Sequence, residues 1–196
     1  MAIHSREITH VEEYFLQRNL NEIEGSFQIS ATYSIDLTPE IVFDALVQLL
    51  YQYCQWSLQC YPSSTAARKY EIKLLKEYRL RDVLEFKSSD DVPFEELLMS
   101  LEFRMKRLAN DKPLWGLIVY DSRTLILWSE HILGDGTSFK NFHIEFLKFL
   151  NGSANGTNEV NASYDGLDSV IFKDQWFESR DISPDQKPNL NQLLKT

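Results

Sequence analysis

One stretch, residues 123–150, constrains the fold more than any other because it carries three structural signals in a fixed order. A short apolar run at 125–128 is typical of a buried strand. The pattern H-x-x-x-D-G follows, with His131, Asp135 and Gly136 at its defining positions. Apolar residues then recur at three- and four-residue spacing, which predicts an amphipathic helix. The stretch therefore predicts a strand, a tight loop and a helix, with an imidazole at the end of the strand.

The helix after this loop is expected to begin near Thr137 and Ser138, two residue types that favour N-cap positions. A pattern as short as H-x-x-x-D-G also arises by chance, and a histidine at a strand end is often only a hydrogen-bonded turn residue. The flanking strand and helix favour a functional loop, because catalytic groups are often carried on loops that rigid elements position.

Hydrophobic patterning predicts short helices and strands in the rest of the first 150 residues. Alternating apolar residues at 26–36 indicate a strand with one buried face. Thr9 with Glu12 forms a capping-box pattern, and Thr38 before Pro39 is a second helix start. A third helix is expected over 93–109. Further strands are expected at 54–60, 70–75, 79–86, 114–120 and 124–128, the last two as a hairpin.

Composition changes after Leu150, where Asn, Ser and Gly become frequent. This composition is typical of a flexible linker. We therefore expect one folded domain in residues 1–150, followed by a flexible linker and polar tail in residues 151–196. The expected fold class is α/β, a two-layer sandwich with helices packed on a mixed sheet.

Charge and hydropathy exclude several classes of protein. The net charge of -9 disfavours a nucleic-acid partner, since phosphate binding needs a basic surface. No apolar run approaches the roughly 18 residues of a transmembrane helix. The N-terminus lacks the apolar region of a signal peptide, so a cytoplasmic protein is expected. In that compartment Cys54 and Cys60 are expected to be reduced core thiols.

A metal site is not expected. His131 and His143 are twelve residues apart, and the sequence offers no Cys or His partners at a useful spacing. Zinc and similar metals need three or four convergent ligands.

Two segments of the chain resemble one family in register. The opening helix, residues 10–18 (HVEEYFLQR), and the strand after it resemble the start of fungal alcohol O-acetyltransferases. Residues 131–136 resemble the active-site motif that this family shares with chloramphenicol acetyltransferase and peptide-synthetase condensation domains. The tripeptide at 113–115 before a strand also fits. The resemblance extends from Arg6 to Leu150 and implies the N-terminal half of that superfamily's fold.

The resemblance implies acyl transfer from acetyl-CoA to a small-molecule alcohol or amine. Acetyl-CoA would be a co-substrate rather than a bound cofactor, and the residues that bind it are not identified. His131 would be the general base, since histidine side chains ordinarily titrate near neutral pH and can accept a hydroxyl proton. Asp135 and Gly136 would be structural: the carboxylate orders the loop and the glycine permits close backbone approach.

Length is where the chain departs from the family. These enzymes have two similar halves, with the substrate channel between them, and a second-half motif of the Asp-Phe-Gly-Trp-Gly type is absent here. One interpretation is a truncated acetyltransferase that self-associates or pairs with a missing second half-domain. The alternative is an inactive remnant that serves as a protein-interaction module. The expected location is the cytoplasm. Peripheral association with membranes or lipid droplets is the alternative.

Overall fold

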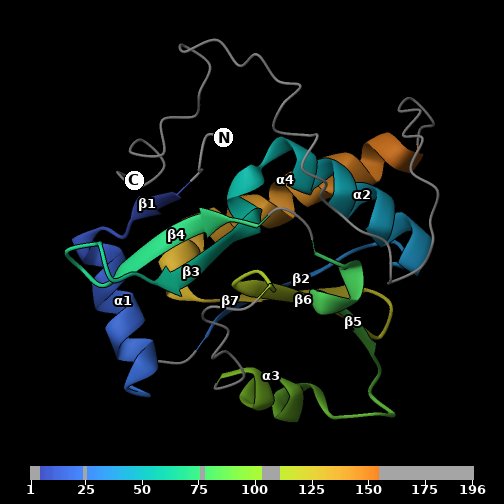
Figure 1. Cartoon of the computed structure of the whole chain (residues 1–196). Coiled ribbons are helices and arrows are strands. Elements are labelled where there is room, and N and C mark those ends of the chain that lie inside the picture. The colour runs from blue at the N-terminus through green and yellow to red at the C-terminus, as the bar shows by residue number, and fades with distance from the viewer. Residues whose placement is uncertain (1–4, 24–25, 76–77, 103–110, 155–196) are drawn as a thin grey trace.

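Two β-sheets and four α-helices form the part of the chain that the computed structural model describes, residues 5–23, 26–75, 78–102 and 111–154 (Figure 1). This arrangement confirms the predicted α/β class.

The larger sheet places its strands in the order β2-β7-β6-β5. Strand β7 is antiparallel to both of its neighbours, whereas β5 runs parallel to β6, so the sheet is mixed, as predicted. Strands β6 and β7 form the predicted hairpin, with Asp121 and Ser122 at positive φ in its turn. The bounds are Phe27–Thr32 for β2, Leu84–Lys87 for β5, Trp115–Tyr120 for β6 and Thr124–Ser129 for β7.

Helices cover both faces of this sheet. The central strands β6 and β7 are buried along nearly their whole length, and successive side chains point to opposite faces. Leu117 and Leu127 face α2 and α4, which lie side by side across one face (Figure 1). Ile118 and Trp128 face α3, which covers part of the second face of the larger sheet. The helix bounds are Pro39–Gln52 for α2, Phe94–Glu102 for α3 and Gly136–Ala154 for α4.

The smaller sheet packs against α1 and has the order β1-β4-β3, with both pairings antiparallel. A group of buried residues, which we call the small core, joins this sheet to α1 and to the loop after β7. Its members are Ile8, Leu16, Cys60, Ile72, Leu114 and Ile132. The bounds are Ser5–Glu7 for β1, His10–Leu20 for α1, Leu58–Pro62 for β3 and Tyr70–Leu74 for β4. The small core fixes the start of the H-x-x-x-D-G loop, because Ile132 belongs to both.

Two helix starts follow the sequence signals. The Glu12 amide donates to the Thr9 hydroxyl at 3.2 Å, and the Thr9 amide donates to the Glu12 carboxylate at 2.6 Å, which confirms the capping box. Thr38 caps α2, and Pro39 is its first residue.

Two predicted strands were wrong in part, and a further strand was missed. The strand expected at 54–60 begins as the 3-10 turn Cys54–Ser57, and only β3 follows as strand. The strand expected at 79–86 is divided in the same way, with the 3-10 turn Leu80–Asp82 before β5. Strand β1 was not predicted at all.

Several predictions reach residues outside the described part. The third helix is described to Glu102, and residues 103–109 of the prediction lie outside. Helix α4 continues to Ala154, and residues 155–196 of the expected linker and tail lie outside.

Among the described helices, none combines the length and apolar composition that crossing a bilayer requires. Cys60 is buried and is not disulfide-bonded, as expected for a core thiol.

Candidate active site

His131 stands at the point where β7 ends and the chain turns toward α4. It opens the 3-10 turn His131–Leu133, in which the Leu133 amide donates to the Glu130 carbonyl at 3.0 Å. The residue is half-buried. The adjacent Ile132 packs in the small core, and this packing fixes the backbone next to the imidazole.

The imidazole makes a hydrogen bond within its own loop. Its Nδ1 lies 3.2 Å from the carbonyl oxygen of Gly134. A carbonyl oxygen can only accept, so Nδ1 carries the proton in this bond and the lone pair of the neutral ring is on Nε2. This is the tautomer that a base acting through Nε2 requires.

Two aromatic rings from other elements lie against the imidazole. The Phe15 ring, from α1, is stacked on it with centroids 4.6 Å apart and planes 12° apart. The Phe27 ring, from the start of β2, meets it edge-on at 5.0 Å and 62°. Phe27 in turn contacts Phe139 of α4 at 5.0 Å. The candidate site is thus built from α1, β2 and the loop between β7 and α4.

Asp135 caps helix α4. Its Oδ1 accepts from the Ser138 amide at 2.9 Å and from the Ser138 hydroxyl at 3.0 Å. The bond from the Ser138 amide is the largest cause that holds the pKa of Asp135 below its ordinary value. The expectation that Thr137 or Ser138 caps this helix is therefore wrong, because the helix begins at Gly136 and the carboxylate before it takes the cap position.

Of the two glycines in the loop, Gly134 has too little space around it for a side chain, whereas Gly136 does not. A Cβ atom at Gly134 would lie 2.9 Å from the Cβ of Ser138, closer than real Cβ contacts come. A Cβ atom at Gly136 would meet Phe27 Cζ at 3.5 Å, an ordinary van der Waals contact. Space therefore requires glycine at Gly134.

A buried carboxyl group precedes the histidine. Glu130 is only 5% exposed, and desolvation raises its pKa to about 8, so the group is mostly protonated at neutral pH. Burial, with the charges of Glu12 and Glu130, raises the pKa of the Cys60 thiol to about 12. No sequence signal marked Glu130, because its burial depends on tertiary packing, which leaves no local pattern.

Helix α1, which carries Phe15, is held by charged side chains at its start. Arg6 of β1 binds both carboxylate oxygens of Glu12, at 2.8 and 2.5 Å. Burial raises the pKa of Glu12, but the bonds from Arg6 and Thr9 outweigh it and hold that pKa below its ordinary value.

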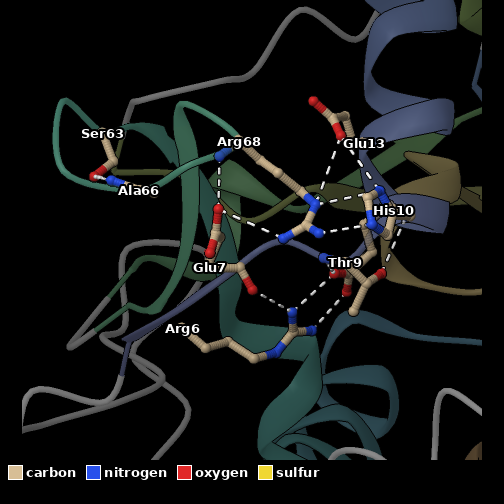
Figure 2. A network of polar contacts seen from close by, with 9 residues as sticks. Arg6, Glu7, Thr9, His10, Glu13, Ser63, Ala66 and Arg68 are labelled. Carbon is tan, nitrogen blue, oxygen red and sulfur yellow. Dashed lines mark hydrogen bonds and ion pairs between the residues drawn. The ribbon is translucent and has the colours of Figure 1, made fainter.

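Arg68 adds a second attachment of α1, from the turn between β3 and β4. Figure 2 shows its guanidinium beside His10, with Glu13 and Glu7 on either side. Its Nη2 lies 2.8 Å from Nε2 of His10, and its Nη1 lies 3.5 Å from the Glu7 carboxylate. These contacts connect α1 to both β1 and the β3–β4 turn.

The structure keeps His143 apart from this site. Its Nδ1 lies 3.0 Å from the Tyr33 hydroxyl, and its Nε2 lies 3.3 Å from the Ile29 carbonyl. Within the described ranges, no group of three or more His, Cys, Asp or Glu side chains is arranged to hold a metal ion.

The fold is similar to one part of the condensation-domain fold. The starter condensation domain of rhizomide synthetase RzmA superposes with a TM-score of 0.63 at 11% identity, covering 81% of this chain and 40% of that one. The epimerization domain from the third module of tyrocidine synthetase B gives 0.61 at 13% identity, covering 83% of this chain and 38% of that one. Polyketide synthase associated protein 5 from Mycobacterium tuberculosis gives 0.52 at 17% identity, covering 82% and 36%.

The chain thus spans about two fifths of the length of these solved structures, and its fold is one half of the condensation-domain fold, as predicted. The family model described as alcohol acetyltransferase matches residues 7–175. The chain therefore belongs to the alcohol acetyltransferase family, which confirms the resemblance drawn from its two motifs. No curated protein matches the sequence.

Proposed function

We propose that this chain is an acyltransferase that moves an acetyl group from acetyl-CoA to the hydroxyl of a small alcohol, with His131 as the general base. The observation that carries this proposal is the hydrogen bond from His131 Nδ1 to the Gly134 carbonyl. That bond leaves the lone pair on Nε2, at a half-buried position in a loop that two rigid elements support. Family membership supplies the reaction class.

The proposed step needs no covalent enzyme intermediate. Nε2 of His131 takes the proton of the acceptor hydroxyl while the oxygen attacks the thioester carbonyl. The C–S bond then breaks, and the imidazolium returns its proton to the departing thiolate of CoA. Cys60 is unsuited to be a nucleophile, because it is buried and its raised thiol pKa keeps it protonated.

Asp135 and Gly136 serve the loop rather than the reaction in this proposal. The Asp135 carboxylate bonds Ser138 within the first turn of α4, so it sets where the helix begins and how the loop leaves His131. Gly136 is the first residue of that helix.

A structural relative supports CoA as the carrier of the acyl group. A variant of the rhizomide synthetase starter condensation domain was solved in complex with C8-CoA and Leu-SNAC. By that likeness we propose a CoA thioester donor here, in its acetyl form because of the family. An alcohol is the acceptor that the family description favours, and an amine is the second acceptor class.

We further propose that the substrate channel is completed by a second copy of the chain or by a separate half-domain. The supporting observation is that the chain spans 36–40% of the length of the structures it resembles. The same observation favours the second candidate function, a non-catalytic interaction module. We propose the cytoplasm as the location in either case.

The test is the release of CoA thiol from acetyl-CoA by the purified chain, offered short-chain alcohols, a sterol and a long-chain amine. His131→Ala runs in parallel, and the acetylated product is identified by mass. Acceptor-dependent release that His131→Ala abolishes supports the proposal. Release that survives this substitution contradicts His131 as the base. If the folded wild-type chain releases no thiol with any acceptor, the chain alone is not the enzyme, and the interaction module becomes the better account.

A further inference from the structure

We propose that Phe15 is a positioning residue, whose ring fixes the orientation and the tautomer of the His131 imidazole. The inference rests on the proposed function, because it assigns a role to Phe15 through the base that this function requires. It also gives a physical role to the opening helix motif, which the acyl-transfer step leaves unexplained.

The stacked geometry restricts the imidazole in a specific way. A histidine ring turns easily about its Cβ–Cγ bond, since that torsion has broad minima. A phenyl ring lying parallel to it at 4.6 Å leaves only the two orientations that share its plane. The bond from Nδ1 to Gly134 selects one of these two, because the flipped ring would place a carbon against the carbonyl. The stack and the hydrogen bond together fix where Nε2 lies.

Phe27 closes a second side of the ring. Its contact is edge-on at 62°, and its own ring packs on Phe139 at the start of α4. Movement of the imidazole away from Phe15 is therefore limited by a side chain that the larger sheet holds in place.

Phe15 is itself held on both sides of its position in α1. Leu16, the next residue, is only 3% exposed and packs in the small core. Tyr14 meets the Phe15 ring edge-on at 5.3 Å and 72°, and the Arg18 guanidinium lies 5.2 Å from the Tyr14 ring centre. The first turn of the helix is bound to β1 through the contact of Arg6 with Glu12. It is bound to the β3–β4 turn through Arg68, which lies beside His10 and Glu13 (Figure 2). The ring is thus placed by an anchored helix rather than by a free loop.

The stack also suits the chemistry of the base. When Nε2 accepts a proton, the ring becomes an imidazolium cation, and the face of an aromatic ring attracts a cation. This attraction acts on the protonated ring that forms during the reaction and not on bound substrate, so it is expressed in kcat.

The test combines one measurement that needs no activity with one that does. Histidine labelled with 13C and 15N is introduced into the full chain, and His131 is assigned by the signal that His131→Gln removes. Phe15→Leu keeps an apolar side chain without a ring, and Phe15→Tyr keeps the ring. The matched control is Val11→Ala, since Val11 lies in the same helix and is 65% exposed.

We expect the ring protons of wild-type His131 to be shifted upfield by the Phe15 ring current, with a 15N pattern that shows the proton on Nδ1. Phe15→Leu should move these protons downfield and introduce the Nε2–H tautomer, whereas Phe15→Tyr and Val11→Ala should match wild type. In turnover, Phe15→Leu should lower kcat about tenfold with each KM within about twofold, and Phe15→Tyr should restore kcat.

The outcomes separate this inference from the proposed function. If wild-type His131 shows no upfield shift, or if Phe15→Leu leaves the tautomer unchanged, the positioning role is overturned whether or not the chain is active. If Phe15→Leu frees the ring and yet keeps the full kcat, the role is also overturned. If the spectra behave as expected and no acyl transfer is found, the acyltransferase proposal fails while the positioning of the ring by Phe15 is supported.

Discussion

Tyr33 and His143, 110 positions apart in the sequence, share a buried hydrogen bond of 3.0 Å between the tyrosine hydroxyl and Nδ1. Nε2 of the same ring lies 3.3 Å from the Ile29 carbonyl, so it carries the proton and His143 is neutral. Burial raises the pKa of Tyr33, which keeps its hydroxyl protonated as the donor. The bond connects α4 to the segment after β2, on the face of the sheet opposite α3.

This pair predicts a loss of stability in mild acid. Burial lowers the pKa of His143 below its ordinary value, so the unfolded chain binds a proton more readily than the folded chain. The free energy of unfolding should therefore fall as the pH drops below about 6.5, where unfolded histidine protonates. Urea denaturation of wild type and His143→Gln from pH 8 to pH 5 measures the effect. The difference in unfolding free energy between wild type and His143→Gln should become smaller toward pH 5. A difference that stays constant with pH would contradict a buried, neutral His143.

Glu130 predicts the opposite pH dependence. Its pKa is raised to about 8 by burial, so the folded chain holds a proton that an unfolded glutamate has already lost. Its contribution to stability is complete below about pH 4 and declines as the pH rises toward 8. Glu130→Gln keeps a neutral side chain of similar shape. Relative to wild type, this variant should gain about 1–3 kcal/mol of unfolding free energy between pH 5 and pH 8. Parallel pH profiles for the two proteins would show that Glu130 is not buried as described.

The helix cap predicts a graded response at Asp135. Asp135→Asn should keep most of the stability, because asparagine is as good an N-cap, whereas Asp135→Ala should cost about 1 kcal/mol. The matched control is Asp90→Ala, an exposed acid in the turn before α3, which should change stability little. Thermal unfolding of the three variants measures this. Equal losses in the asparagine and alanine variants would mean that the charge of Asp135, and not its cap bond to Ser138, is what matters.

Two glycines in the same loop predict contrasting results. Gly134→Ala forces a Cβ to within 2.9 Å of Ser138 and should destabilise the protein by about 1–3 kcal/mol. Gly136→Ala adds a Cβ in ordinary contact with Phe27, at the first position of a helix where alanine is favoured over glycine. It should be neutral or slightly stabilising. Urea denaturation of the two variants measures their unfolding free energies. If Gly136→Ala were the less stable of the two, the described geometry of the loop would be contradicted.

Local signals were enough to predict several elements. The Thr9 and Glu12 capping box needs only residues three apart, and the hairpin of β6 and β7 needs only two apolar runs around a short turn. The loop residues His131 and Asp135 stood out because their spacing is itself a local pattern. Each of these features is set by interactions between near neighbours in the chain.

The remaining features depend on contacts between distant segments. Strand β1 has only three residues, and it is a strand because it pairs with β4, where Arg6 faces Ile72. The stack of Phe15 on His131 exists because the small core brings α1 to the end of β7. Nothing in the sequence around Phe27 shows that its ring contacts the histidine, and nothing around Glu130 shows that its carboxyl group is buried. Pairing and burial of this kind require the tertiary structure.

The measurement that tests the central claim most directly is the ratio of turnover between His131→Gln and wild type, with acetyl-CoA and one acceptor alcohol at saturation. The control is Val11→Ala, which alters a residue of α1 that is 65% exposed. We predict that His131→Gln lowers turnover by about 10²- to 10⁴-fold, as the loss of a general base does, while Val11→Ala stays close to wild type. Turnover by a folded His131→Gln protein within a fewfold of wild type would show that His131 is not the base.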